Sequence, residues 1–148
     1  MTDRDSVKVL LVEDDLGHAE LIKRNLQRSS RSLRISHVAD GQAAVDYLRH
    51  AGDYAGENDQ PAPDLILLDL RLPRLDGLEV LRQIKEDPAL ARIPVVILTT
   101  SHSEPDIAEA YARRANSYLV KPVDFQQFSN LMDQVKHYWT VWNEYPEK

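Results

Sequence analysis

Apolar residues along the chain form two kinds of pattern. Five short runs of mainly branched aliphatic residues are typical of parallel strands buried on both faces, at 7–12, 33–38, 65–70, 93–98 and 116–120. Between these runs, apolar residues recur at helical spacing opposite a polar face, as Ala19, Ile22 and Leu26 do. Strand and helix therefore alternate five times with short connections. Right-handed crossovers then predict an α/β fold, a doubly wound five-stranded parallel sheet with helices on both faces.

Short polar residues mark the starts of four of the predicted helices: Asp40, Asp76, Ser103 and Asp124. Glu79 stands three residues after Asp76, which predicts a capping box at the third helix. Residues 52–63 are rich in Gly, Asp, Asn and Pro, which indicates an exposed connecting loop.

Composition narrows the class of protein. The 148 residues are 43% hydrophobic and 28% charged, which fits one domain over 1–148, with a core at about 7–140 and an aromatic extension at 141–148. The net charge of −6 and the absence of a basic run argue against nucleic-acid binding. There is no cysteine, no signal-peptide pattern and no apolar run of membrane length, so we expect a cytoplasmic protein.

The carboxyl ends of parallel strands meet at one edge of a sheet, and here they carry five residues with chemical potential: Glu13, Asp14, Asp69, Thr99 and Lys121. Carboxylates about 4 Å apart repel by about 1–4 kcal/mol per pair, so a cation must accompany them. Lys121 is the only cationic side chain predicted nearby. Oxygen ligands without His or Cys favour Mg²⁺. A carboxylate, Mg²⁺, a hydroxyl and an ammonium together can stabilise a phosphoryl group, with Asp69 as the nucleophile of an acyl phosphate.

Each of these residues has a simpler interpretation when it is taken alone. Asp69 could cap a helix, Glu13 and Asp14 could begin one, Thr99 could end a strand and Lys121 could be solvated. All five would have to coincide for that interpretation to hold. The five histidines are scattered without ligand spacing, so we assign them no catalytic role, and we expect His18 and His102 to be surface residues near the site.

Four segments carry a resemblance to a known family: Val-Glu-Asp-Asp at 12–15, Leu-Asp-Leu-Arg-Leu-Pro-Arg-Leu-Asp-Gly at 68–77, Pro-Val-Val-Ile-Leu-Thr at 94–99 and Tyr-Leu-Val-Lys-Pro at 118–122. Over about residues 7–140 the chain resembles response-regulator receiver domains, the chemotaxis-regulator type of the flavodoxin-like (βα)5 fold. Each segment alone is weak evidence, but their order and spacing make a strong match.

The resemblance implies a role for each matching position. Asp69 would accept a phosphoryl group from the phosphohistidine of a histidine kinase. Asp14 would bind Mg²⁺ directly and Glu13 through water, while Arg71 would contribute its backbone carbonyl. Lys121 would pair with Asp69 and then with the phosphate.

The same resemblance implies a conformational switch. Thr99 would bind a phosphoryl oxygen after phosphorylation, and Tyr118 would then turn inward. The bond between Lys121 and Pro122 would be cis.

Three functions follow from these residues. The leading one is a two-component response regulator, a signalling switch that catalyses only its own phosphorylation and dephosphorylation and is not a turnover enzyme. We expect no output module, so the protein would signal through protein contacts or a histidine phosphotransfer protein. The alternative is a Mg²⁺-dependent phosphohydrolase, but such enzymes commonly carry Asp where this chain has Arg71. The third is a receiver that binds partners without phosphorylation.

The last helix carries an apolar stripe with steps of four and three residues: Phe128, Met132, Val135, Trp139 and Trp142. Near and beyond residue 140, Tyr138, Val141, Trp142 and Tyr145 extend this apolar surface, which predicts a homodimer through the last helix and the tail. The tail, the loop at 52–63 and Leu-Thr-Thr-Ser at 98–101 also resemble small response regulators of phytochrome kinases. This narrower resemblance implies a phytochrome as the kinase partner.

Overall fold

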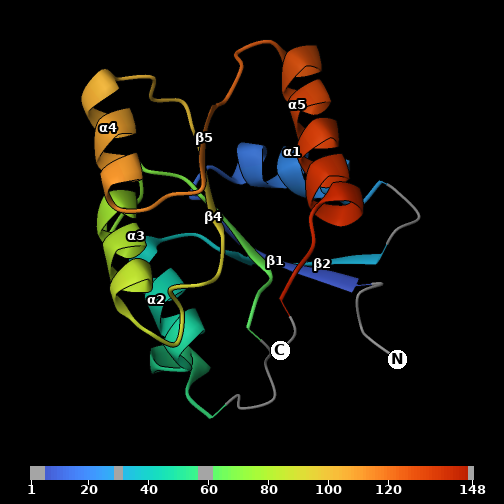
Figure 1. Cartoon of the computed structure of the whole chain (residues 1–148). Coiled ribbons are helices and arrows are strands. Elements are labelled where there is room, and N and C mark those ends of the chain that lie inside the picture. Colours follow the sequence, from blue (N-terminus) through green and yellow to red (C-terminus); the bar gives the residue numbers. More distant parts are fainter. Residues whose placement is uncertain (1–5, 29–31, 57–61, 147–148) are drawn as a thin grey trace.

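A five-stranded parallel sheet forms the centre of the molecule (Figure 1). The structure, a computed structural model, describes residues 6–28, 32–56 and 62–146. The strands are β1 (Ser6–Val12), β2 (Ser32–Val38), β3 (Leu65–Leu68), β4 (Val95–Thr99) and β5 (Ser117–Val120). Their order in the sheet is β2-β1-β3-β4-β5, and each adjacent pair is parallel. The predicted doubly wound fold is confirmed.

The position of β3 and β4 within the sheet explains why their sequences are continuously apolar. Every residue of β3 and of β4 is buried, because helices cover both faces of the sheet. After β2 the chain returns past β1 to form β3, so the strand order reverses between β1 and β3. Ligand sites in open α/β sheets lie at such a reversal, outside the carboxyl ends of the strands.

Two layers of helices cover the sheet (Figure 1). Helices α1 (Leu16–Leu26) and α5 (Phe125–His137) lie on one face, and α2 (Gly41–Arg49), α3 (Gly77–Glu86) and α4 (Glu104–Ala112) lie on the other. The predicted inward residues of α1, namely Ala19, Ile22 and Leu26, are buried. The predicted loop at 52–63 contains a 3-10 turn, Gly52–Tyr54, and its residues 57–61 lie outside the described residues.

Three of the four predicted helix N-caps are confirmed. The side chains of Asp40, Ser103 and Asp124 each accept a hydrogen bond from the backbone N–H three residues later, as caps should. Asp76 precedes α3 but its side chain makes no cap hydrogen bond. The predicted capping box is therefore wrong, because the Glu79 carboxylate binds the Arg82 guanidinium on the exposed side of the helix instead.

Gly77 at the start of α3 is required by a close backbone approach. A Cβ atom there would lie 2.3 Å from the backbone oxygen of Asp69 and 2.6 Å from the Cα of Leu70. The Gly77 N–H donates to the Leu70 carbonyl at 3.0 Å. The absence of a side chain thus lets the β3–α3 connection turn tightly behind Asp69.

Helix α5 continues into a π-helical turn, Tyr138–Trp142, and the chain then folds back. Tyr145 is partly buried, and its hydroxyl donates to the Trp139 carbonyl at 2.5 Å. Tyr138, Val141 and Trp142 are 53%, 55% and 70% exposed. Three of the four residues expected on an apolar surface are therefore exposed, whereas Tyr145 packs against the domain. Among the described helices, none is long and apolar enough to cross a membrane.

Candidate functional site

The carboxyl ends of four strands bring the predicted residues together. Glu13 directly follows β1, Asp69 follows β3, Thr99 ends β4 and Lys121 follows β5. Two backbone hydrogen bonds continue the strand pairing into the site, from Asp69 N to Val12 O (3.1 Å) and from Lys121 N to Thr99 O (2.7 Å). The sheet register thus fixes the backbone on which these side chains stand.

Three carboxylates form the acidic part of the site. Glu13, Asp14 and Asp69 each offer an oxygen, and these oxygens lie within 4.8 Å of one another. At that separation two carboxylates repel by about 1–4 kcal/mol, depending on how far water screens them. Hard oxygen ligands in this number, two buried and Asp14 exposed, fit a Mg²⁺-like ion that keeps part of its water shell.

Lys121 supplies the positive charge inside the cluster. Its Nζ donates to Glu13 Oε1 at 2.6 Å and to Asp69 Oδ2 at 2.9 Å, and all three side chains are buried. The Lys121 Nζ also lies 3.0 Å from His18 Nδ1. His18 lies near the site as expected and is partly exposed, but it is more than a surface residue, because the start of α1 places its half-buried ring against the lysine.

The two buried carboxyls differ in their pKa values. Burial raises the pKa of Glu13 to about 7, although Lys121 acts in the opposite direction. Burial also acts to raise the pKa of Asp69, but the adjacent Lys121 ammonium and the hydrogen bond from Thr99 outweigh it, so the pKa is lowered. Asp69 is therefore ionised near neutral pH and able to attack or to bind a metal ion, whereas Glu13 changes its protonation state in that range.

Thr99 and Tyr118 are connected through the loop that follows β4. The Ser101 N–H donates to Thr99 Oγ1 at 3.4 Å, and the Tyr118 hydroxyl donates to the Ser101 carbonyl at 2.9 Å. Thr99 is completely buried and Tyr118 is half-buried. Burial raises the pKa of Tyr118, so its hydroxyl stays protonated and able to donate. A displacement of Thr99 would thus reach Tyr118 through Ser101.

The backbone of Arg71 contacts the site, whereas its side chain contacts α4. Its N–H lies 3.3 Å from Asp69 Oδ1. Its guanidinium instead binds Asp106 Oδ2 at 2.6 Å, and the Ser101 hydroxyl donates to the same oxygen at 2.6 Å. Asp106, in the first turn of α4, was not singled out by the sequence, because nothing in the pattern pairs it with Arg71.

The bond between Lys121 and Pro122 is trans, since no peptide bond among the described residues is cis. The expectation of a cis bond is therefore wrong for this structure. The trans form is the intrinsically favoured one for a bond before proline, by about 0.5–1 kcal/mol.

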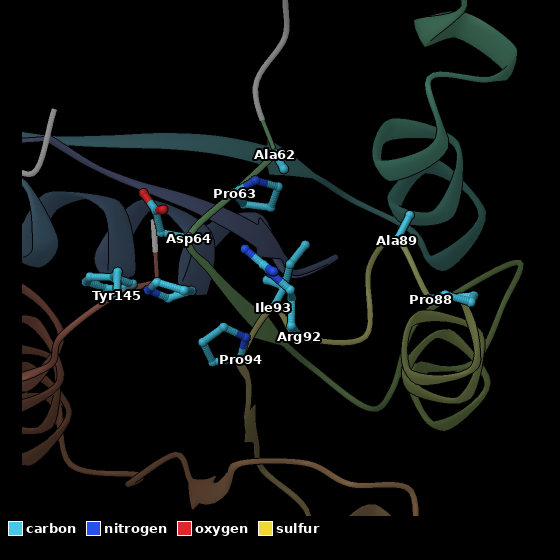
Figure 2. Close-up of a pocket in the computed structure, with 10 residues that line it drawn as sticks. Ala62, Pro63, Asp64, Pro88, Ala89, Arg92, Ile93, Pro94 and Tyr145 are labelled. Carbon is cyan, nitrogen blue, oxygen red and sulfur yellow. The ribbon is translucent and has the colours of Figure 1, made fainter. Parts of the chain in front are cut away.

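A hollow of about 390 Å³ lies at the opposite edge of the sheet, where residues 62–64 and 92–94 lead into β3 and β4. Figure 2 shows Tyr145 and Pro88 on opposite sides of this hollow, with Arg92 between them. It is separated from the carboxylate cluster by the length of the strands. The residues that the sequence predicts to be functional therefore lie not at this hollow but at the carboxyl ends of the strands.

Comparison with known proteins decides the family. The sequence profile described as the response regulator receiver domain matches residues 9–133. The chain belongs to the response regulator receiver family.

Two curated relatives match most of the chain. It is 46% identical to the probable methanogenesis regulatory protein FilR2 of Methanothrix harundinacea over 143 residues, which cover 96% of this chain and 89% of FilR2. It is 41% identical to the response regulator Rcp1 of Synechocystis sp. over 131 residues, which cover 88% of this chain and 87% of Rcp1.

Two solved structures show the same fold. The phosphorylated cyanobacterial phytochrome response regulator RcpA matches with a TM-score of 0.90 and 40% identity, covering 96% of this chain and 99% of RcpA. The Mn²⁺-bound form of Rcp1 matches with a TM-score of 0.90 and 39% identity, covering 95% of this chain and 99% of Rcp1. The predicted resemblance to single-domain phytochrome response regulators is confirmed.

Proposed function

We propose that this receiver is a phosphorylation-dependent switch whose Asp69 accepts a phosphoryl group from a histidine kinase. The observation that carries the proposal is the pairing of Asp69 with Lys121 at 2.9 Å inside a cluster of three carboxylates. An ionised carboxylate oxygen, a nearby ammonium and a divalent-ion site are the groups that phosphoryl transfer requires.

In the transfer step an Asp69 carboxylate oxygen attacks the phosphorus of phosphohistidine. A P–O bond forms while the P–N bond breaks, and the imidazole nitrogen leaves with the electron pair. Glu13, Asp14, Asp69 and the backbone carbonyl of Arg71 would hold Mg²⁺, which would neutralise charge on the phosphoryl oxygens. The Mn²⁺-bound form of Rcp1 supports a divalent cation in this role.

After transfer, the phosphoryl group adds about −1.5 to −2 charges next to Thr99 and Lys121. Lys121 would donate to a phosphoryl oxygen, and the Thr99 hydroxyl would turn toward another. Ser101 and Tyr118 are linked to Thr99 by hydrogen bonds, so they would move with it. The surface of β4, α4 and β5 would therefore report the state of Asp69.

The partners follow from the relatives and from the exposed tail. RcpA is named a cyanobacterial phytochrome response regulator, Rcp1 is named a response regulator, and FilR2 is named for methanogenesis. We therefore propose a sensor histidine kinase, with a phytochrome as the narrower candidate, and output through protein contacts or phosphorelay. Tyr138, Val141 and Trp142 would form a homodimer surface on the last helix and its π-helical turn.

Acetyl phosphate tests the proposal without the kinase. The wild-type protein with Mg²⁺ is expected to gain one phosphoryl group by intact-mass spectrometry, and Asp69→Asn is expected to gain none. Asp53→Asn, an exposed position on the 3-10 turn, is the matched control and should behave as the wild type. Wild-type protein that remains unmodified would contradict the proposal and favour a phosphorylation-independent receiver.

A phosphohydrolase would give a different result in a phosphate-release assay. It would release many equivalents of phosphate from a small phosphate ester per protein. The position where such enzymes commonly carry an acid-base Asp is Arg71, whose guanidinium is tied to Asp106. We therefore expect no multiple turnover, measured as phosphate released from p-nitrophenyl phosphate.

A further inference from the structure

His18 is held over the site by two different helices. Asp15 caps α1 and its Oδ1 accepts the His18 N–H at 3.0 Å, which fixes the residue at the third position of the helix. The imidazole ring packs against the ring of Phe128 in α5, with centroids 5.9 Å apart. The ring is therefore positioned by α1 and α5 independently of Glu13, Asp14 and Asp69.

The contact between Lys121 and His18 has a defined polarity. An ammonium group carries three donors and no acceptor, so His18 Nδ1 must accept through its lone pair, and the ring proton must sit on Nε2. The three acceptors around Lys121 Nζ are then Glu13 Oε1 at 2.6 Å, Asp69 Oδ2 at 2.9 Å and His18 Nδ1 at 3.0 Å. This arrangement satisfies all three donors of a buried charge.

We propose that His18 is a positioning residue for Lys121 in phosphoryl transfer. The inference rests on the proposed function, because two of the three acceptors change their role in that reaction. Asp69 would become bonded to phosphorus, and Glu13 would also face the metal ion. His18 is the one acceptor of the three without another role in the reaction, so it would hold the ammonium in place while one N–H moves from Asp69 to a phosphoryl oxygen.

A competing arrangement would make the ring a partner of Asp15 instead. His18 Nδ1 lies 3.8 Å from Asp15 Oδ2, and a hydrogen bond there would need a proton on Nδ1. The distance of 3.0 Å to Lys121 is within hydrogen-bonding range, whereas 3.8 Å is not. The geometry favours the lysine as the partner.

Substitutions at His18 separate the acceptor from the bulk of the ring. His18→Asn places an amide oxygen at the position of Nδ1, and His18→Gln places the same amide one bond further out. His18→Leu retains volume against Phe128 without an acceptor. The measurement is the rate of phosphorylation by acetyl phosphate at saturating Mg²⁺. In His18→Asn we expect this rate to stay within about twofold of wild type. In His18→Gln and His18→Leu we expect it to fall by about three- to tenfold, the scale of one partly exposed hydrogen bond to a charge. Mg²⁺ affinity, measured by titration calorimetry, should be unchanged in all three.

NMR spectroscopy provides a readout that does not need phosphorylation. In the wild type we expect a resolved NH₃⁺ signal for Lys121 that shifts in His18→Leu and is restored toward wild type in His18→Asn. The nitrogen signals of the His18 ring should show an unprotonated Nδ1 and a protonated Nε2.

Three results would overturn the inference: a proton on Nδ1, a Lys121 signal indifferent to His18→Leu, or equal phosphorylation rates in the Asn, Gln and Leu variants. A wild-type protein that is not phosphorylated at all would refute the proposed function. The NMR measurements would then still report on the His18 contact, so the two failures are distinguishable.

Discussion

Arg71 Nη2 lies 2.6 Å from Asp106 Oδ2, so the residue two positions after Asp69 is tied to the first turn of α4. Ser101 donates to the same carboxylate oxygen, which connects the β3–α3 loop, the β4–α4 loop and α4 through one side chain. In the unphosphorylated protein this contact holds the loop after Thr99 in place. Asp106 is therefore expected to resist the movement that follows phosphorylation.

Asp106→Ala should accelerate phosphorylation by acetyl phosphate about two- to tenfold, the scale of one or two lost hydrogen bonds. The physical reason is that the loop carrying Ser101 would no longer have to break its contact with α4. The measurement is the initial rate of phosphoprotein formation at fixed Mg²⁺. Glu109→Ala is the matched control, since it removes an exposed ion pair with Arg113 from the same helix. Equal rates in the two variants would refute a restraining role for Asp106.

Mg²⁺ affinity should rise with pH because of Glu13. Its pKa is raised to about 7, so the metal-free protein carries a proton on Glu13 below that pH, and metal binding must release it. Affinity is thus expected to increase as the pH rises from about 6 to about 8 and then to level off. Titration calorimetry across this range checks the slope.

Glu13→Gln should flatten this pH dependence, whereas Glu79→Gln should leave it unchanged. Glu79 is the control because its hydrogen bond with Arg82 lowers its pKa to about 2, far below the range of the titration. A slope that persists in Glu13→Gln would assign the titration to another group.

Trp142→Asp should weaken self-association by at least about tenfold, since exposed aromatic anchors commonly contribute about 2 kcal/mol or more to an interface. Trp142 is 70% exposed and its ring lies beside that of His137, with centroids 6.2 Å apart. Light scattering at tens of micromolar should show a dimer for the wild type and a monomer for the variant. Tyr111→Asp, which alters an exposed aromatic on α4, should remain dimeric. A monomeric wild type would remove the basis for the proposed interface.

Gly77→Ala should lower the free energy of unfolding by about 1–3 kcal/mol, because the new methyl group meets backbone atoms that have little room to move. The closest is the Asp69 carbonyl oxygen at 2.3 Å, so phosphorylation should also slow. Urea unfolding measures the first effect. At Gly17 the nearest atom is a side-chain oxygen of Asp15 at 3.3 Å, and Gly17→Ala is therefore the tolerated control. Equal stability of the two variants would show that the loop behind Asp69 adjusts.

The fold and the carboxylate cluster were predictable because they depend on long, regular patterns. Fully buried strands such as β3 read as continuous apolar runs, and parallel strands necessarily bring their carboxyl ends to one edge. The sequence alone therefore predicts that Glu13, Asp69 and Lys121 lie together, and the structure has Lys121 bonded to both carboxylates.

The missed features are contacts between elements that no local pattern encodes. The His18 ring lies between Lys121 and Phe128 of α5, and Arg71 contacts Asp106, which is 35 positions away in sequence. Lys85 is another case: it is buried, and its Nζ donates to the carbonyls of Ala91 and Ile93, although its type predicts exposure. Such side chains are placed by tertiary packing, which periodicity does not report.

The central claim is that Asp69 forms an acyl phosphate. Borohydride reduces an aspartyl phosphate to homoserine, so the protein can be phosphorylated with acetyl phosphate and Mg²⁺, reduced, digested and sequenced by mass spectrometry. We predict homoserine at position 69 in the treated wild type and aspartate there when acetyl phosphate is omitted. Homoserine at another aspartate, or unmodified Asp69 after treatment, would contradict the account.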